Sequence, residues 1–206
     1  MALPVSLLWI DGSHRASSTG RTYNVLNSGS QAVVGYAACA SSEDALAAIE
    51  AAAAAQPAWE AVHPATKRDI LLKASDLIQT PKYADRVMDI MQTDTAAHET
   101  WAAGEVPATV ALIRDAALCA VQLLGETMPS ERADGGTVLV ERRALGTVFA
   151  ISPFNSPVLL AARAVVVPIA CGNTVVLKSS EVSPRCAEIV VEALYEVYPM
   201  CPVLNY

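Results

Sequence analysis

The longest apolar stretch of the chain runs from Ala144 to Leu177 and contains one charged residue, Arg163. Residues that favour turns interrupt it repeatedly, among them Pro153, Asn155, Pro157, Pro168, Gly172 and Asn173. A membrane-spanning helix needs roughly 20 uninterrupted apolar residues. The pattern therefore predicts a buried core that contains a site, and not a membrane span.

The first half of this stretch predicts a strand followed by a buried helix. Residues 147–152 are apolar and rich in β-formers, and Pro153 cannot continue the strand because proline has no amide hydrogen to donate. Pro157 suits a first helical turn, and Pro168 suits the end of a helix of about three turns.

The second half predicts a strand and another helix. Residues 174–178, TVVLK, are apolar without alternation, which is typical of a parallel strand buried on both faces. Ser183 suits the N-cap and Pro184 the first turn of the next helix. Ligands bind at the carboxyl ends of such strands, where Lys178 lies. We therefore predict an α/β fold, with residues 174–178 as the first strand of an incomplete, doubly wound parallel sheet.

The N-terminal part predicts two hairpins and a layer of helices. Apolar runs flank Asp11-Gly12 in the first hairpin, with a strand at residues 5–10, and Ser28-Gly29 in the second, at residues 21–38. Helical patterns then occupy residues 41–62, 65–80, 81–93 and about 98–124. In the second of these helices Lys67 falls on the polar face. We expect these helices to provide scaffold.

The segment between the helices and the apolar stretch predicts a pair of strands. Gly135-Gly136 turns the chain into two strands separated around Leu145-Gly146, so a hairpin is expected over residues 136–152. Its alternation of apolar and polar residues is weak. A plain hairpin packed in the core is one interpretation of this segment, and it competes with the oligomerisation hairpin that the resemblance below implies.

Composition narrows the class of partner. Of 206 residues, 53% are hydrophobic and 17% charged, which leaves apolar surface for a partner. A net charge of -7 without a long Lys/Arg cluster argues against nucleic acid and anionic membranes. Five cysteines with no CxxC pair and no basic leader before the first strand favour reduced thiols and a cytoplasmic location.

Isolated titratable residues are assigned structural roles. His63 and His98 each lie at a predicted helix start without a second ligand at metal-binding spacing, so capping or solvated histidines are expected. No metal site is predicted. Glu99 and Glu105 look like polar-face carboxylates, and each cysteine is expected to be buried, although Cys171 lies close in sequence to Asn155.

Two motifs carry a resemblance to a known family. PFNSP at residues 153–157, and ACGNTVVLKSSEVSP at residues 170–184, resemble the aldehyde dehydrogenase superfamily. That family has a Pro-Trp-Asn turn, a Gly-Asn-Thr-Val-Val-Leu-Lys-Pro-Ser-Glu strand and a Thr/Ser-Pro helix start. The sequence departs from it at Phe154, where tryptophan is usual, and at Ser179, where proline is usual.

The resemblance implies a cofactor and a set of site residues. Asn155 would be the side-chain donor of the oxyanion hole, and Ser152, Pro153 and Phe154 would lie beside the nicotinamide cofactor. Lys178 and Glu181 would hold the adenosine ribose. A carboxylate suits ribose hydroxyls and repels a ribose phosphate, so Glu181 favours NAD over the alternative, NADP.

The resemblance also implies a substrate and a division of the chain. Arg163 followed by VVVPIACGNTVVLK is closer to the branch that oxidises aromatic aldehydes such as salicylaldehyde or vanillin. Residues 1–135 would be hairpins and helices of the cofactor-binding domain. Residues 136–152 would be an oligomerisation hairpin for homo- or hetero-oligomers. Residues 153–206 would hold the oxyanion turn and the first, truncated βαβ unit, with a further strand near 203–206.

Two functions of different classes follow. The first is NAD-dependent oxidation of an aldehyde to the carboxylic acid. The family's thiol nucleophile and general-base glutamate lie beyond the motifs found here, so the catalytic domain is expected to be absent. The alternative is therefore a catalytically inactive truncated fragment, at most an interaction or pseudoenzyme module, with weak or no binding of NAD.

Overall fold

The computed structural model describes residues 2–199, and the strand predicted near residues 203–206 lies outside them. The helices are α1 (Ser42–Glu60), α2 (Pro64–Ile78), α3 (Pro81–Thr95), α4 (Glu99–Gln122), α5 (Pro157–Ala170) and α6 (Pro184–Val197). The strands are β1 (Val5–Ser6), β2 (Leu8–Ile10), β3 (Ser13–Arg15), β4 (Thr22–Leu26), β5 (Val33–Ala38), β6 (Glu126–Pro129), β7 (Thr137–Val140), β8 (Thr147–Ile151) and β9 (Thr174–Lys178).

The centre of the molecule is the unit β8-α5-β9. The two strands are parallel and in register from Thr147 opposite Thr174 to Ile151 opposite Lys178. The first four residues of β9 are buried and Lys178 is exposed, as the apolar run predicted. The βαβ unit therefore begins at Thr147 and not at residue 153, because β8 is already one of its strands.

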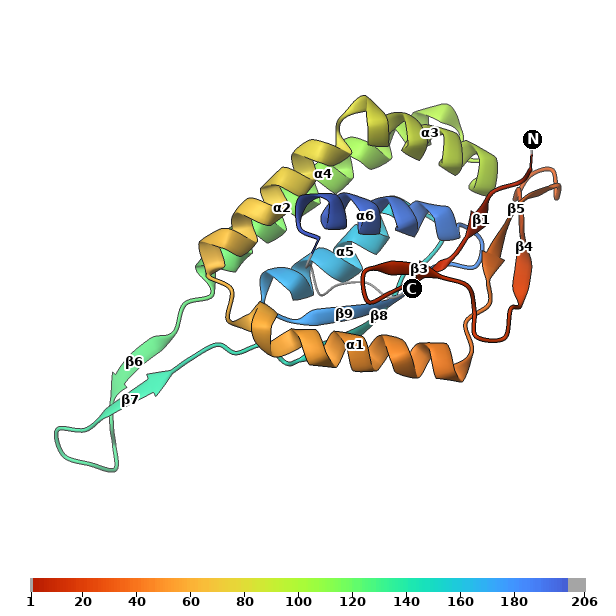
Figure 1. The fold of residues 1–206 in the computed structure, drawn as a ribbon. Coiled ribbons are helices and arrows are strands. Elements are labelled where there is room, and N and C mark those ends of the chain that lie inside the picture. Colours follow the sequence, from red (N-terminus) through yellow and green to blue (C-terminus); the bar gives the residue numbers. More distant parts are fainter. Residues whose placement is uncertain (1, 200–206) are drawn as a thin grey trace.

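Helices lie on both sides of this parallel pair (Figure 1), and Phe149 and Ile151 of β8 remain exposed. On one face α1 packs Ala48 and Ala52 against Val176 of β9. On the other face α5 and α6 form a layer, and α2, α3 and α4 lie beyond it. The main core runs through these helices and β9. This arrangement confirms the predicted α/β class, with a helical layer over an incomplete parallel sheet.

Asn173 fixes the turn between α5 and β9. Its side-chain nitrogen donates to the carbonyl of Pro168 at 3.0 Å. Its side-chain oxygen accepts from the backbone N–H groups of Leu145 (2.7 Å) and Gly146 (3.1 Å). One side chain thus ties the end of α5 to the start of β8. Gly172 takes φ +87° beside it, a backbone conformation that glycine tolerates best.

The predicted capping histidines are confirmed. His63 and His98 are the N-cap residues of α2 and α4, and each accepts through Nδ1 from the N–H two residues ahead, at 3.2 Å. Lys67 of α2 was expected on the polar face, and this was wrong. It is 6% exposed and donates to the carbonyl of Glu60 at 2.9 Å, because the turn after α1 folds over it.

The N-terminal hairpins form across the predicted turns, with one change. β2 pairs with β3 across Asp11-Gly12, and β4 with β5 across Ser28-Gly29, both antiparallel. Residues 5–10 are not one strand, because β1 pairs with β5 in parallel and the chain then leaves that edge to form β2. The absence of a side chain at Gly35 permits this contact, since a Cβ there would lie 3.1 Å from the carbonyl oxygen of Pro4.

The prediction of a hairpin over residues 136–152 was wrong about which strands pair with each other. β7 pairs antiparallel with β6, whereas β8 pairs in parallel with β9. Residues 141–146 carry the chain from one structure to the other. The hairpin β6–β7 protrudes from the body (Figure 1), and all its strand residues are exposed, so it is not a core hairpin either. The pairing differs because the hydrogen-bonding groups of β8 are directed to the buried strand β9.

Candidate functional site

The predicted site residues emerge from one edge of the parallel pair. Ile151 and Lys178 are the last paired residues of β8 and β9. Beyond them, the backbone N–H of Ser152 donates to the carbonyl of Lys178 at 3.1 Å. The turn at residues 152–156 and the loop at residues 178–182 therefore leave the sheet together. This is the carboxyl edge at which ligands bind in α/β folds.

Lys178 and Glu181 form an ion pair on this edge. Nζ of Lys178 lies 2.7 Å from Oε2 of Glu181, and both side chains are exposed. The hydrogen bond from Lys178 lowers the pKa of Glu181 below its ordinary value. The carboxylate is therefore ionised at neutral pH and able to accept hydrogen bonds from hydroxyl groups.

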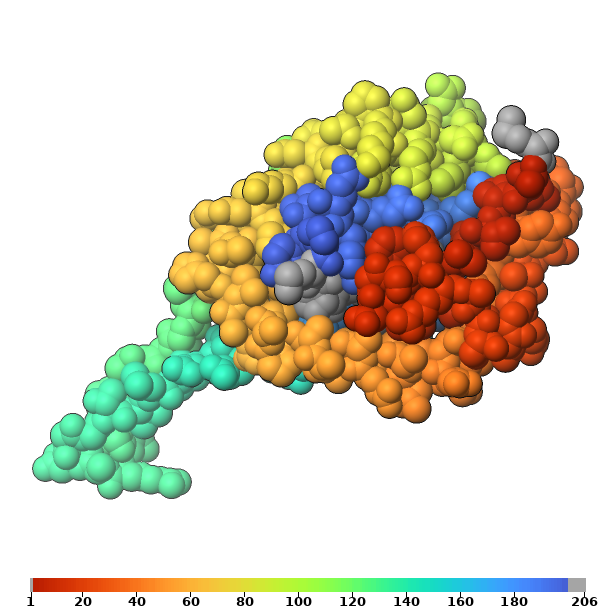
Figure 2. Space-filling model, viewed as in Figure 1, coloured from red at the N-terminus to blue at the C-terminus, as the bar shows by residue number. Residues whose placement is uncertain are grey.

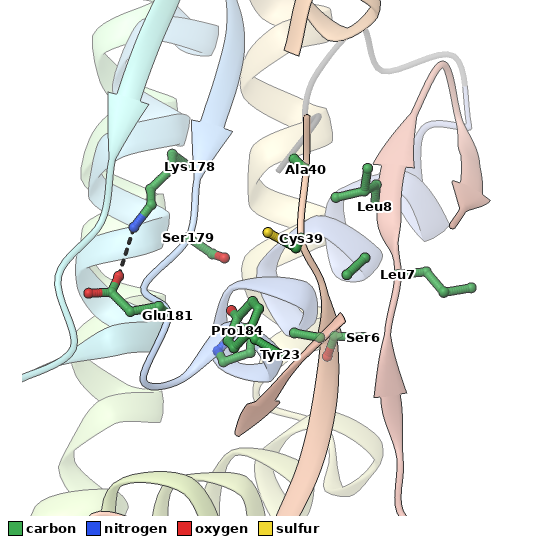
Figure 3. Close-up of a pocket in the computed structure, with 12 residues that line it drawn as sticks. Ser6, Leu7, Leu8, Tyr23, Cys39, Ala40, Lys178, Ser179, Glu181 and Pro184 are labelled. Carbon is green, nitrogen blue, oxygen red and sulfur yellow. Dashed lines mark hydrogen bonds and ion pairs between the residues drawn. The ribbon is translucent and has the colours of Figure 1, made fainter. Parts of the chain in front are cut away.

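A pocket of about 280 Å³ opens beside this pair (Figure 3). Lys178, Ser179 and Glu181 form one wall, and the segment Ser6–Leu8 forms the opposite wall. Cys39, the residue that follows β5, also lines the pocket. Tyr23 also lines the pocket, and burial raises its pKa to about 12, so it keeps its proton and can donate a hydrogen bond.

The turn that carries Asn155 lies on the same edge outside this pocket. Pro153, Phe154 and Asn155 are exposed, and Ser152 is buried. The backbone carbonyl of Asn155 accepts from Nε1 of Trp101 in α4 at 3.2 Å. This bond anchors the turn through the main chain, and the Asn155 amide side chain is exposed to solvent. None of these four residues lines the pocket of Lys178 and Glu181.

Glu105 was missed by the sequence analysis. It was taken for an ordinary polar-face residue, and it is 3% exposed. Its carboxylate accepts from the hydroxyl of Ser156, from the N–H of Val158 at 3.2 Å and from that of Leu159 at 2.9 Å. A carboxylate from α4 thus caps α5 and neutralises its N-terminal partial charge. It fixes the start of the helix that follows Asn155.

The predicted N-cap Ser183 occupies its position without the expected bond. Its side chain makes no capping hydrogen bond, and its hydroxyl is buried without a hydrogen-bond partner among the described residues. The loop that precedes it is held instead by Ser180, whose hydroxyl accepts from the N–H of Val182 at 3.2 Å. The helix α6 therefore starts from the fixed geometry of Pro184.

The cysteines differ in their surroundings. Cys186 is buried, Cys39 and Cys171 are partly buried and Cys119 is exposed. The expectation that each cysteine is buried therefore holds among the described residues for Cys186 alone, and Cys201 lies outside them. Burial raises the pKa of Cys171, which follows the last residue of α5. The 14 residues of α5 extend about 21 Å, with Asn155 before the first turn and Cys171 after the last. Cys171 therefore cannot act on a group bound at Asn155.

Comparisons with known proteins agree with this geometry. The model of the aldehyde dehydrogenase family matches residues 14–203. The chain is 36% identical over 200 residues to salicylaldehyde dehydrogenase of Pseudomonas sp. (strain C18), covering 96% of this chain and 39% of that protein. It is 38% identical over 191 residues to vanillin dehydrogenase of another Pseudomonas strain, covering 92% of this chain and 38% of that protein.

A solved structure shows the same fold. The salicylaldehyde dehydrogenase from Pseudomonas putida G7, complexed with salicylaldehyde, superposes with a TM-score of 0.93 at 32% identity. The match covers 98% of this chain and 41% of that one. The chain thus spans about two fifths of the length of these relatives. In the part of the chain that the structure describes, no helix has the length and apolar character to cross a membrane. On the extent of these matches, the chain belongs to the aldehyde dehydrogenase family.

Proposed function

We propose that this chain supplies the adenosine-binding edge and the oxyanion donor of a nicotinamide-dependent aldehyde dehydrogenase, which oxidises an aldehyde to a carboxylic acid. One observation carries the proposal. Lys178, Glu181 and the turn of Asn155 all follow the carboxyl ends of β8 and β9, two adjacent parallel strands. Their common edge lets one extended cofactor contact both groups.

Lys178 and Glu181 fit the adenosine ribose of such a cofactor. The carboxylate accepts from vicinal hydroxyls, and the ammonium group holds it in place while donating to a ribose oxygen. A phosphate on the 2′ oxygen would meet the ionised Glu181. Like charges repel, so the proposed cofactor is NAD and not NADP. The bound nicotinamide ring would accept the hydride from the substrate carbon.

Asn155 fits the role of oxyanion donor. Its backbone is anchored by Trp101, and the next helix is fixed by Glu105, so the exposed amide side chain starts from a rigid turn. A preorganised donor of this kind stabilises the negative charge on the former aldehyde oxygen. Removing one such donor generally lowers the turnover number by a factor on the order of 10² to 10³.

The substrate class proposed is an aromatic aldehyde. Two matched relatives are named salicylaldehyde dehydrogenase and vanillin dehydrogenase, and both names describe aldehydes on an aromatic ring. The neighbouring solved structure contains salicylaldehyde. The proposal for this chain rests on these likenesses and on the motif around Arg163.

The alternative is a catalytically inactive module that binds a longer homologue. The separation of Cys171 from Asn155 by the length of α5 supports it, because acyl-enzyme chemistry needs an activated thiol beside the oxyanion donor. The exposed hairpin β6–β7 offers a surface for pairing with another subunit. This alternative predicts no NADH from benzaldehyde-type or aliphatic aldehydes when the chain is assayed alone.

Cofactor binding is tested by ligand-observed NMR with AMP and NAD. We expect both to bind weakly and with similar affinity, because the contacts proposed for this chain are to adenosine. Lys178→Ala and Glu181→Gln should each abolish the signal, whereas Glu131→Gln in the loop between β6 and β7 should not change it. Equal signals from all variants would remove both residues from the site.

A further inference from the structure

The hairpin β2–β3 packs against α6, far along the chain (Figures 1 and 2). Trp9 of β2 contacts Tyr195 of α6, with ring centroids 4.8 Å apart. His14 of β3 lies directly opposite Trp9 in the antiparallel register, and their rings meet edge to face at 4.3 Å. These ring contacts restrict the imidazole to the side of the hairpin that faces α6.

Two carboxylates of α6 face this imidazole. Glu188 and Glu192 are four residues apart and therefore lie on one face of the helix, one turn from each other. A nitrogen of His14 and an oxygen from each glutamate all lie within 4.8 Å of one another. His14 is exposed and the two glutamates are partly buried, so solvent can reach the cluster.

We propose that His14, Glu188 and Glu192 bind one divalent transition-metal ion, with Zn²⁺ the best fit. Zinc takes imidazole nitrogen and carboxylate oxygen at about 2.0–2.2 Å, which puts tetrahedral ligands about 3.4 Å apart. The side chains would close by up to about 1.4 Å from their present spacing, a movement within reach of partly exposed glutamates. Water would fill the fourth position. An imidazole ligand favours zinc over calcium or magnesium, which prefer oxygen.

The local charge favours a cation. Glu192 is paired with Arg86 of α3, whose Nη1 lies 2.5 Å from Oε2. Glu188 accepts a long hydrogen bond of 3.4 Å from the hydroxyl of Ser6. The two carboxylates and the guanidinium of Arg86 together carry a net negative charge, and zinc binds imidazole in its neutral form. A bound metal would fasten the N-terminal hairpin to α6, which is a structural role independent of the proposed activity.

The test is equilibrium dialysis of the EDTA-treated chain against Zn²⁺ at neutral pH, with bound metal measured by mass spectrometry. We expect one ion per chain at this cluster, and at least about a tenfold loss of affinity in His14→Ala and in Glu188→Gln. Two controls should stay within about twofold of the unmodified chain. His98→Ala removes another exposed histidine, and Glu196→Gln removes a carboxylate of α6 that is paired with Lys82.

Because cysteine thiolates are also zinc ligands in general, Co²⁺ substitution is used to distinguish metal bound at this cluster from metal bound at a cysteine. Co²⁺ at the cluster should give visible absorption without a thiolate charge-transfer band in the near ultraviolet. Saturating Zn²⁺ should also raise the melting temperature by about 5 °C, and not in His14→Ala. Circular dichroism in EDTA verifies that each variant is folded. If His14→Ala does not fold, the near-isosteric Glu188→Gln is the variant that tests the cluster. Unchanged affinity in the folded cluster variants, thiolate ligation alone, or no bound metal would overturn the proposal.

Discussion

The two pairs of strands β6–β7 and β8–β9 are about equally short, yet β6 and β7 are exposed whereas β9 is buried. β6–β7 is antiparallel, protrudes from the body and has every residue exposed, with Leu139 at 70%. β8–β9 is parallel, and Val175 and Leu177 of β9 are fully buried between helices. Because burial of apolar surface supplies most folding stability, the unit around β8–β9 should determine stability, and the hairpin should determine association.

The largest effect on stability is expected at the ion pair of Asp94 and Arg185, which lies in the buried body of the molecule and not in the hairpin. The side chain of Asp94 is fully buried, and the guanidinium of Arg185 in α6 donates to its carboxylate through two nitrogens. Arg185→Ala leaves a buried carboxylate without its partner, so the free energy of unfolding should fall by about 3–5 kcal/mol. Urea denaturation measures it, with Arg132→Ala in the exposed loop after β6 as the control.

The same variant should show a pH dependence. Burial raises the pKa of Asp94 above its ordinary value of 3.8 even with Arg185 present, and removing the cation raises the pKa further. A carboxyl with a raised folded-state pKa destabilises the fold above the unfolded pKa, and this penalty disappears as pH falls through the folded pKa. The stability difference between variant and unmodified chain should therefore shrink toward acid pH. A constant difference would show that the charge of Asp94 is not the cause.

The next effect concerns the carboxylate that caps α5. Glu105→Ala leaves the hydroxyl of Ser156 and the N–H groups of Val158 and Leu159 without their acceptor. We expect a loss of about 3 kcal/mol, which lowers the melting temperature by roughly 6–12 °C for a chain of this size. Asp115→Ala, an exposed position of the same helix, should change it little. Equal losses in both variants would contradict the capping role.

The smallest effect on stability is expected in the hairpin. Leu139→Lys should leave the free energy of unfolding within about 0.5 kcal/mol, because its side chain is exposed. If the hairpin pairs with another subunit, as we propose, the same change should reduce the mass measured by light scattering. Ser130→Ala, at the tip side of β6, is the matched control. If Leu139→Lys lowers the free energy of unfolding and leaves the mass unchanged, the hairpin contributes to stability and not to association, which contradicts the account.

These two regions also show how far the sequence can be interpreted. Residues 174–178 were predicted as a buried strand because an apolar run without alternation fits little else, and the structure confirms it. The partner of β7 could not be predicted, because β6 reads ETMP, which has neither alternation nor β-branched apolar residues. Strand pairing depends on which edges remain available, and local sequence does not record this.

The site shows the same limit. Lys178 and Glu181 were predicted as cofactor-binding residues from a contiguous motif; both line one pocket, and their role stays a prediction. The roles of Glu105 and Lys67 were missed because their partners are distant or are backbone atoms: Glu105 acts on residues 51–54 positions away, and Lys67 on a carbonyl. The one available signal for Glu105 was that it is the single charged residue between Trp101 and Ile113 of α4.

The most direct test of the account is hydrogen exchange of the chain with and without saturating NAD, measured by mass spectrometry. The account predicts slower exchange in the segments 178–184 and 37–40, which contribute lining residues to the pocket of Lys178 and Glu181. It predicts no change at residues 126–140 in the hairpin. Glu181→Gln should remove the protection. Protection confined to the hairpin, or none at residues 178–184 when NAD is bound elsewhere, would contradict the claim that the carboxyl edge of β8–β9 is the cofactor site.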